Sequence, residues 1–356
     1  VTMGAGSSDR VYLYGNSTAT SIDLGDGNTQ RAELRGDASV GTLTFGSGTT
    51  STSSSYRDYV YLYDTASAGT INLGTGGGQF VYLYNDTEVG AITGSSTYGF
   101  DYVILSGNAI ATSIDLGAQN DSVQLSGNSS VTNIDLGTEN DTVRLYDSSS
   151  AADIGLGNGN DSVYIYNINA WDPTSAIDGG AGTDYLYLQA SNVTFDLRSA
   201  NITGVEILSA NSTNTTILID NDTLTGVTQL SGSSTGTFST DAASVDLTGK
   251  SVSNVTLESS NATGTTFTVG DKNTALQIFG GAGSDTIETS SFAFTATERD
   301  FIFNTSSVEV LKDTTGIFGN SSANILSADT AGSSLYGAGG ADTLIGDIGN
   351  DSMTGG

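Results

Sequence analysis

The chain has 356 residues and a formal charge of −29, from 39 acidic and 10 basic side chains, and it contains neither cysteine nor histidine. These absences exclude a disulfide framework, a thiol–zinc site and any catalytic triad that uses histidine. The negative charge disfavours nucleic acid and anionic membranes, and no apolar run is long enough to span a bilayer. We therefore expect no nucleic-acid partner and no membrane insertion.

Alternating apolar residues recur through the first half of the chain. The sequence holds 47 glycines and one proline, with much Ser, Thr, Asn and Asp, which favours short strands joined by tight turns. Apolar pairs return at intervals of about twenty residues or slightly more. The pairs are Val11/Leu13, Ala32/Leu34, Val60/Leu62, Val81/Leu83, Val103/Leu105, Val123/Leu125, Val143/Leu145 and Val163/Ile165.

A second set of apolar pairs lies between the first, so each repeat carries two short strands and two turns. One repeat cannot bury its own apolar residues, and neighbouring repeats must therefore stack. The sequence predicts an all-β fold, a right-handed parallel β-solenoid (β-roll) with about two strands per coil of roughly 20 residues, forming an elongated rod. A globular β-sandwich with accidental self-similarity is the alternative. The second set is Ile22/Leu24, Ile71/Leu73, Ile114/Leu116, Ile134/Leu136 and Ile154/Leu156.

One turn of the coil carries an aspartate two positions before the inward valine. Stacking would bring these carboxylates within one strand spacing, ~4.8 Å, which is unfavourable for like charges unless a cation lies between them. Oxygen ligands in a flexible turn suit Ca²⁺ better than Zn²⁺ or copper. Ordinary turn chemistry is the alternative. Gln30 and Gln79 occupy the same position, where we expect weak or absent metal binding. The aspartates are Asp9, Asp58, Asp101, Asp121, Asp141 and Asp161.

Two outward-facing stripes follow from the same alternation. If Val and Leu point inward, the tyrosines beside them point outward, where they could bind glycan, contact another subunit or only stabilise the sheet. On the opposite strand Asp23, Asp115 and Asp135 face outward, with Asn72 in the same place. That stripe is either a second cation site or a solvated acidic face. The tyrosines are Tyr12/Tyr14, Tyr61/Tyr63, Tyr82/Tyr84 and Tyr164/Tyr166.

Glycine-rich nonapeptides appear further along. GGAGTDYLY (179–187) and GGAGSDTIE (280–288) fit the pattern GGxGxDxUx, where U is a large apolar residue, and GAGGADTLI (337–345) and GDIGNDSMT (346–354) follow in tandem. These motifs resemble the RTX (repeats-in-toxin) family of calcium-binding β-rolls. The resemblance implies several Ca²⁺ ions, held by aspartate side chains and by glycine carbonyls. By position these residues are Asp184, Asp285, Asp342, Asp351, Gly180, Gly182, Gly281, Gly283, Gly340 and Gly349.

Some turns depart from the motif. The turn that ends at Asp161 keeps the glycine spacing, and we therefore include Gly159 and Asn160 among the expected metal-binding residues. Gln119 and Glu139 replace the second glycine of their turns. Ala338 replaces the second glycine of the third nonapeptide, which puts the geometry of that turn in doubt.

The motifs divide the chain into three regions. Residues 1–190 are expected to form a calcium-binding β-roll, 191–275 a metal-poor continuation of the solenoid, and 276–356 an RTX nonapeptide region cut within a longer array. The step ITGVE (202–206), followed by strands that run into a nonapeptide, resembles bacterial surface-layer proteins of the RTX type. We expect the chain to be a piece of a longer protein.

No cluster of residues indicates catalysis, so we expect no enzyme. The leading hypothesis is an extracellular, calcium-stabilised structural protein that assembles into a bacterial surface layer or filament. As the resemblance implies, it would leave the cell unfolded by type I secretion and fold on meeting calcium. Expected partners are further copies of the chain and cell-surface polysaccharide. The alternative is a spacer or ligand-binding segment of a long RTX adhesin that binds glycan. Ice binding needs a regular Thr/Asn array, and the array here is irregular.

Overall fold

The computed structural model describes residues 1–4, 8–27, 29–46, 57–75, 78–95, 99–329 and 332–356. The chain forms two compact units. Unit 1 comprises Val1–Ala190 and Ser199–Leu208, and unit 2 comprises Ser191–Arg198 and Ser209–Gly356. Both are mainly parallel β-solenoids with about 21 residues per turn, which confirms the predicted all-β solenoid but not its handedness.

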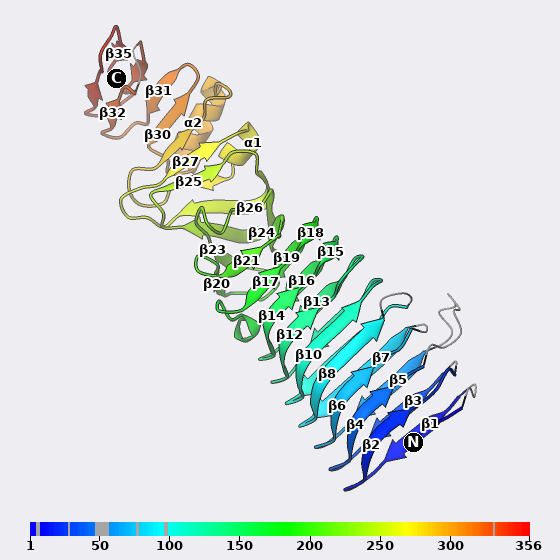
Figure 1. Cartoon of the computed structure of the whole chain (residues 1–356). Coiled ribbons are helices and arrows are strands. Elements are labelled where there is room, and N and C mark those ends of the chain that lie inside the picture. The colour runs from blue at the N-terminus through cyan, green and yellow to red at the C-terminus, as the bar shows by residue number, and fades with distance from the viewer. Residues whose placement is uncertain (5–7, 28, 47–56, 76–77, 96–98, 330–331) are drawn as a thin grey trace. The chain divides into compact units, whose positions relative to one another are not determined.

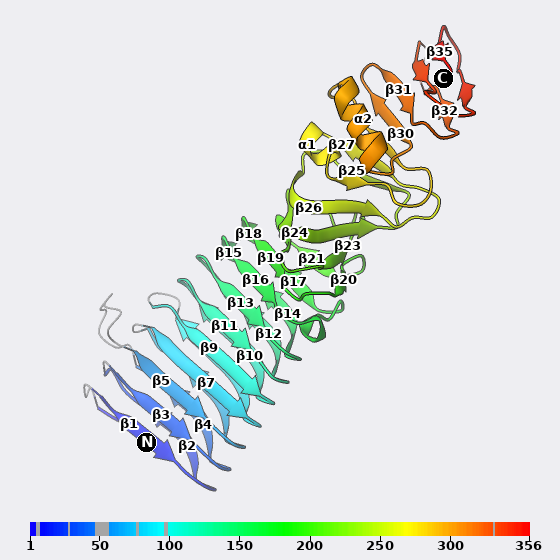
Figure 2. The same cartoon turned by 180° about the vertical axis from the view of Figure 1, so that it is seen from behind.

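Each coil of unit 1 contributes one strand to each of two parallel sheets (Figure 1). Successive coils lie side by side, so sheet 1 follows the chain in steps of one coil, as the view from behind also shows (Figure 2). Sheet 1 contains β1 (Arg10–Leu13), β3 (Arg31–Leu34), β5 (Asp58–Leu62), β7 (Gln79–Asn85), β9 (Tyr102–Gly107), β11 (Ser122–Leu125), β13 (Thr142–Leu145), β16 (Ser162–Ile165) and β19 (Tyr185–Leu188).

Sheet 2 takes the other strand of each coil, in the same order along the chain. Its strands are β2 (Thr18–Asp23), β4 (Ser39–Thr44), β6 (Ser67–Asn72), β8 (Glu88–Ser95), β10 (Ile110–Gly117), β12 (Ser130–Asp135), β14 (Ser150–Gly155), β17 (Ala176–Asp178) and β21 (Asn201–Thr203). Unit 1 also contains the short pair β15 (Asn158–Gly159) and β18 (Ala181–Gly182) and the 3-10 helix η1 (Ile168–Ala170). In the sequence, β22 (Ile207–Ala210) crosses from unit 1 to unit 2.

The core of unit 1 consists of the predicted apolar pairs, stacked in register. Val60 faces Val81 and Leu62 faces Leu83 on the neighbouring strand. All four side chains are fully buried, and each contributes about 1.5–3 kcal/mol by leaving water. The second set stacks in the same way, with Ile114 facing Ile134. The two sets of pairs were therefore predicted correctly, and they fix which residue of each turn falls at the same place in every coil.

Unit 2 continues with shorter strands. One group of strands is β20 (Thr194–Asp196), β23 (Thr216–Leu218), β24 (Gln229–Thr240), β26 (Ser251–Ser259) and β28 (Ile278–Phe279). A second sheet contains β25 (Ser244–Leu247), β27 (Thr266–Val269), β29 (Thr286–Glu288), β30 (Val310–Asp313), β31 (Gly316–Gly319), β33 (Ser334–Tyr336) and β35 (Ser352–Thr354). The remaining pair is β32 (Ile325–Ser327) with β34 (Thr343–Ile345).

Two features of unit 2 were not expected from the sequence. Strands β30 and β31 pair in the antiparallel direction, which interrupts the parallel stacking. Two helices, α1 (Lys272–Ala275) and α2 (Ala296–Thr305), lie beyond the strand pattern. Helix α2 begins with a capping box, because the Thr295 hydroxyl accepts the Glu298 N–H and the Glu298 carboxylate accepts the Thr295 N–H. Within the residues that the structure describes, no helix has the length and apolar character to cross a membrane.

Candidate metal centre: a ladder of buried carboxylates

The predicted aspartates of unit 1 occupy one corner of the coil, where a sheet 2 strand ends and the next sheet 1 strand is about to begin. We call this position the ladder position. The alignment of sheet 1 strands brings Asp121, Asp141 and Asp161 into neighbouring coils, because Ser122, Thr142 and Ser162, the residues that follow them, pair with one another. The aspartate side chains are almost fully buried, with at most 2% of their surface exposed. Asp101 and Asp184 extend the same buried row.

One carboxylate oxygen of each ladder residue holds the preceding coil. The Oδ1 atom of Asp121 accepts the backbone N–H of Asp101, and Oδ1 of Asp141 accepts that of Asp121, both at 2.6 Å. Asp161 and Asp184 repeat this contact at 2.7 and 2.8 Å. These charge-assisted bonds tie neighbouring coils together at the corner.

The second carboxylate oxygen of each ladder aspartate, Oδ2, has surroundings unlike those of the first. The Oδ2 atoms of Asp121, Asp141, Asp161 and Asp184 are buried and have no hydrogen-bond partner in the protein. Burial raises the pKa of Asp121 to about 9, with the nearby Asp101 adding to the effect, and it raises the pKa of Asp141 to about 8. A buried acceptor without a donor is costly, about 1–3 kcal/mol or more for a charged group. The row therefore needs either protons or cations.

Gln30 shows what the corner accepts when the ladder residue is neutral. Its backbone N–H is bound by Oδ1 of Asp58 at 2.7 Å, so it occupies the ladder position, as predicted. Its side-chain amide nitrogen donates to the carbonyl oxygens of Leu24 and Gly25, each at 2.6 Å. A donor on the side chain therefore fits this corner, and the acceptors it binds are backbone carbonyls.

The strand register implies that the aspartate coils place acceptors on both sides of the same space. By strand register, Leu136 and Gly137 of one aspartate coil correspond to Leu24 and Gly25, since the residues before them, Asp135 and Asp23, occupy equivalent positions of sheet 2. Where Gln30 presents an amide N–H to such carbonyls, Asp141 has a carboxylate oxygen. A cation bound by both would take the place of the missing donor. Carboxylate and carbonyl oxygens are the ligands that Ca²⁺ prefers.

The nonapeptide corners of unit 2 follow the same plan. Oδ1 of Asp285 accepts the Thr265 N–H at 2.7 Å, while its Oδ2 is buried without a partner. A Cβ placed on Gly280 would lie 2.9 Å from that Oδ2, so the first glycine of the motif leaves room for the carboxylate. Asp342 repeats the pattern, with its Oδ1 accepting the Asn324 N–H at 3.0 Å and its Oδ2 unpartnered.

The remaining predicted aspartates lie at ladder positions with different surroundings. Asp58 is buried, which raises its pKa to about 6. Asp9 is half-buried, with an unpartnered Oδ2. In Asp351, Oδ1 accepts the Ser333 N–H at 3.0 Å and Oδ2 accepts the Asp347 N–H at 2.9 Å, so both oxygens are already bonded. Asp351 therefore offers a cation less than Asp342 does.

Asn160 belongs to a separate, outer row of asparagines. Oδ1 of Asn140 accepts the Asn160 N–H at 2.6 Å, and Oδ1 of Asn160 accepts the Thr183 N–H at 2.9 Å. These bonds run from each side chain to the following coil, opposite in direction to the aspartate bonds. The Asn160 side chain is exposed and already hydrogen-bonded. Its position is therefore explained without the metal ion that was predicted to bind there.

The turns keep their shape where glycine is replaced. Gly159 and Gly182 lie two residues before their aspartates and have φ values of +153° and +148°. Gln119 and Glu139 stand at the same place and also have positive φ, +89° and +75°, which costs about 1–2 kcal/mol per residue. Ala338 likewise has φ +64°. The corner is therefore retained in the turns where the sequence put it in doubt.

The other glycines named in the prediction also lie in these corners. Each has a positive φ value, so each turn is built in the left-handed region that glycine adopts most readily. A Cβ on Gly180 would come within 1.9 Å of the Gly157 carbonyl oxygen, because the stacked turns approach closely. The set is Gly180, Gly281, Gly283, Gly340 and Gly349.

Sequence reasoning missed two glutamates that continue the ladder. The Oε2 atom of Glu206 accepts the Asp184 N–H at 2.8 Å, and Oε2 of Glu309 accepts the Asp285 N–H at 2.8 Å. The signal was present, because VEIL (205–208) and VEVL (308–311) each occur one coil after a full nonapeptide. In both places the longer side chain reaches the N–H that an aspartate binds elsewhere.

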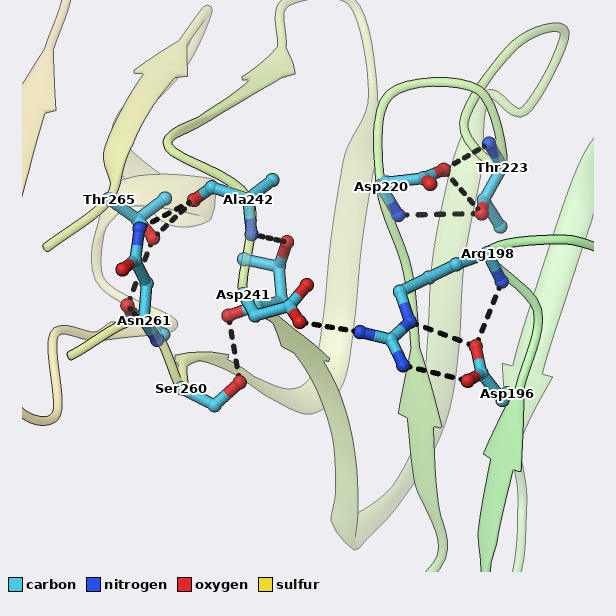
Figure 3. A network of polar contacts seen from close by, with 11 residues as sticks. Asp196, Arg198, Asp220, Thr223, Asp241, Ala242, Ser260, Asn261 and Thr265 are labelled. Carbon is cyan, nitrogen blue, oxygen red and sulfur yellow. Dashed lines mark hydrogen bonds and ion pairs between the residues drawn. The ribbon is translucent and has the colours of Figure 1, made fainter. Parts of the chain in front are cut away.

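Several acidic groups between the nonapeptide regions are partnered within the protein (Figure 3). Arg198 binds both carboxylate oxygens of Asp196 and also Oδ2 of Asp241, the two closest contacts being 2.7 Å. Oδ1 of Asp220 accepts the N–H and hydroxyl of Thr223, each at 2.8 Å. These carboxylates are exposed or compensated, and they lack the buried, unpartnered oxygen that marks the ladder.

The described residues contain no group of three or more acidic side chains that could hold a metal by themselves. A cation in the ladder would therefore take one or two carboxylate oxygens and complete its shell with turn carbonyls and water, as Ca²⁺ can. Zn²⁺ and copper prefer nitrogen or sulfur ligands, which this chain, lacking His and Cys, does not offer. The donor set fits calcium.

Comparisons with known proteins found no relative: no family model, no curated protein and no solved structure matches the chain.

Proposed function

We propose that this protein is a calcium-stabilised structural solenoid that folds outside the cell and assembles with further copies into a surface layer or filament. The observation that carries the proposal is the row of buried carboxylates, each with one oxygen bound to the neighbouring coil and the other left without a donor. A stack of such groups is difficult to fold in the absence of a cation and stable in its presence.

Calcium would neutralise and ligate the second oxygen of the ladder residues. The residues that would hold it are Asp121, Asp141, Asp161, Asp184, Asp285 and Asp342, together with carbonyls of their glycine turns. The first oxygen of each would continue to bind the N–H of the preceding coil. Metal binding and coil stacking are then one event, because the unfolded chain has no preformed site.

Extracellular folding follows from the calcium requirement. Modules that need millimolar calcium remain unfolded where free calcium is scarce and fold where it is abundant. The net charge of −29 supports this, since it opposes compaction until cations condense it. A chain without cysteine needs no oxidative step on leaving the cell. The resemblance to RTX nonapeptides implies the export route, which is type I secretion.

A stalk or ligand-binding segment of a long adhesin is the second candidate. It would use the same calcium-stabilised coils but remain monomeric, and the stacked, partly exposed tyrosines of sheet 1 would offer a surface for saccharide. The two candidates share the ladder and differ in self-association. They are therefore separated by the state of the calcium-loaded protein in solution.

The test begins with chelated protein, titrated with CaCl₂ and, in parallel, with MgCl₂. We expect circular dichroism to show a gain of β-structure with calcium and calorimetry to show several bound ions, with a much weaker response to magnesium, which demands a stricter geometry. β-structure that is unchanged in excess EGTA would overturn the calcium requirement. Negative-stain electron microscopy of the same samples then shows assemblies, as we propose, or single particles, as the stalk candidate requires.

A matched pair of substitutions isolates the ladder. Asp141→Asn removes one buried ladder charge, while Asp135→Asn makes the same charge change on an exposed residue of sheet 2. We expect calorimetry to show fewer bound calcium ions for the first variant and the wild-type number for the second. Equal stoichiometry in both variants would mean that calcium binds elsewhere.

A further inference from the structure

The outer faces of the two sheets in unit 1 differ in charge. All the positively charged side chains between residues 1 and 190 are arginines that lie on sheet 1 strands or directly beside them. They are Arg10, Arg31, Arg35, Arg57 and Arg144. Glu33, on the outer face of β3, is buried under bonds from Arg31 and Arg35, so the face carries net positive charge in a strongly acidic protein.

Sheet 1 also presents tyrosines in stacked rows. Tyr61 stacks on Tyr82 with ring centroids 5.0 Å apart, and Tyr164 stacks on Tyr187 at 4.6 Å. Four of the five arginines lie over aromatic rings, as Arg144 does over Tyr164 at 5.3 Å. Burial of the ring faces raises the pKa of Tyr61, Tyr82 and Tyr187, so these phenols remain protonated hydrogen-bond donors. The outer surface of sheet 1 therefore presents guanidinium and phenol groups that can donate hydrogen bonds.

Sheet 2 presents the opposite chemistry. Its outward positions hold Asp115, Asp135 and Asp153 on three successive strands, all exposed. Asp115 and Asp135 lie directly opposite each other, and burial together with the charge of Asp135 raises the pKa of Asp115. Glu88 and Asp178 add exposed carboxylates on the same sheet. With every arginine of residues 1–190 on sheet 1, this acidic face has no internal counter-charge.

We propose that the acidic outer face of sheet 2 in one copy of the chain docks against the arginine and tyrosine face of sheet 1 in a second copy. This rests on the proposed assembly function and names the contact that would build it. Both faces are made by the same coils, so donors and acceptors repeat with the same inter-strand spacing of ~4.8 Å. Complementary charge brings the faces together and sets their orientation.

Such a contact would extend without limit. It joins two different surfaces, and because sheets 1 and 2 enclose the core between them, their outer faces point away from each other. A heterologous contact of this kind, unless it closes into a ring, leaves a free face at each end for another copy. Growth of a filament therefore needs no second type of contact, whereas a layer would need a further contact in another direction.

Three full-length variants test the proposal in calcium. The acidic-face variant carries Asp115→Asn, Asp135→Asn and Asp153→Asn, and the arginine-face variant carries Arg10→Glu, Arg57→Glu and Arg144→Glu. The control variant carries Asp37→Asn, Asp86→Asn and Asp147→Asn, the same charge change at the exposed corner that leads from sheet 1 to sheet 2. Circular dichroism first verifies that each variant folds. Sedimentation velocity then measures assembly.

We expect each face variant alone to lose assembly by roughly tenfold or more, the control to assemble like the wild type, and added salt to weaken wild-type assembly. An equimolar mixture of the two face variants retains one intact contact, so it should form a 1:1 dimer and grow no further. An acidic-face variant that assembles like the wild type, or a mixture without dimer, would overturn the proposal. In that case the outer face of sheet 1 would be assigned either to contact with the same face of a second copy or to binding of saccharide. If calcium-loaded wild-type protein does not assemble at all, the assembly function itself fails.

Discussion

The coil that contains Gln30 and the coil that contains Asp141 solve one problem in two ways. At both ladder positions the backbone N–H is bound by the aspartate of the following coil. The Gln30 amide then donates to two corner carbonyls, while the outer oxygen of Asp141 has no donor to meet. A single change of side chain, from amide to carboxylate, converts a self-sufficient corner into one that requires a proton or a cation. In the proposed function, calcium dependence would therefore be a local property of each coil.

Removing calcium should have the largest effect and should separate the two kinds of coil. In EGTA we expect hydrogen exchange to accelerate most in peptides from residues 121–184, where the unpartnered carboxylates lie in consecutive coils. Peptides around Gln30 should be protected for longer, because their corner is satisfied by protein groups. Mass spectrometry of the exchanged protein measures this directly. Uniform loss of protection along unit 1 would show that the coils unfold as one unit. The difference between the Gln30 corner and the Asp141 corner would then have no effect on local stability.

Acid should partly replace calcium. In the folded, metal-free protein the pKa values of Asp121 and Asp141, about 9 and about 8, lie above the unfolded value of 3.8. The folded state then binds more protons than the unfolded state between these values, so its stability falls as pH rises through that window. In EGTA we expect a lower melting temperature at about pH 8 than at about pH 5. In excess calcium the trend should reverse, because protons compete for the same oxygens.

Asp141→Asn should change stability with opposite sign in the two conditions. In EGTA at a pH above its pKa of about 8, where Asp141 is ionised, the variant replaces a buried charge by an amide that can donate, as Gln30 does, and we expect a gain of about 1–3 kcal/mol in the free energy of unfolding. In calcium it loses a ligand and should be less stable than the wild type. Denaturant unfolding in both buffers measures the difference, with Asp135→Asn as the control. A loss of stability in both buffers would contradict the ladder model of the corner.

Gln30→Glu makes the reverse change and should have the smallest effect, because only one coil is altered. The carboxylate would face the Leu24 and Gly25 carbonyls, so we expect a loss of about 1–3 kcal/mol in EGTA. Calcium should restore part of this loss. Gln124→Glu, on the outer face of sheet 1, is the matched control, and it should not respond to calcium. Equal responses of the two variants would remove the special role of Gln30.

The parts of the fold that the sequence predicted are those set by periodicity. The pairing of Val60 with Val81, and of Ile114 with Ile134, could be predicted because each coil must cover the next with similar apolar residues. The ladder aspartates were found for the same reason, since they keep a fixed distance from those residues. The left-handed conformation of Gln119 and Glu139 follows from the register as well, although neither residue favours it by itself.

The parts that the sequence did not predict depend on where individual side chains reach. The register placed Gln30 in the ladder, but only the folded corner shows that its amide binds two carbonyls. Glu206 was missed because the pattern was defined by aspartate. The longer glutamate side chain accepts the same backbone N–H that an aspartate accepts in the other coils. Helix α2 lies outside the repeat, and its signal was the local Thr295/Glu298 capping box, which a search for repeats passes over.

The ladder bond spans different lengths of chain without losing register. It joins residues 28 apart between Gln30 and Asp58, 22 apart between Gln79 and Asp101, and 20 apart between Asp121 and Asp141. The strands on either side pair as they do elsewhere in unit 1. The ladder corner is thus one place where the repeat tolerates extra residues, which makes it a natural point for inserting a foreign peptide loop while the stacked core continues unchanged.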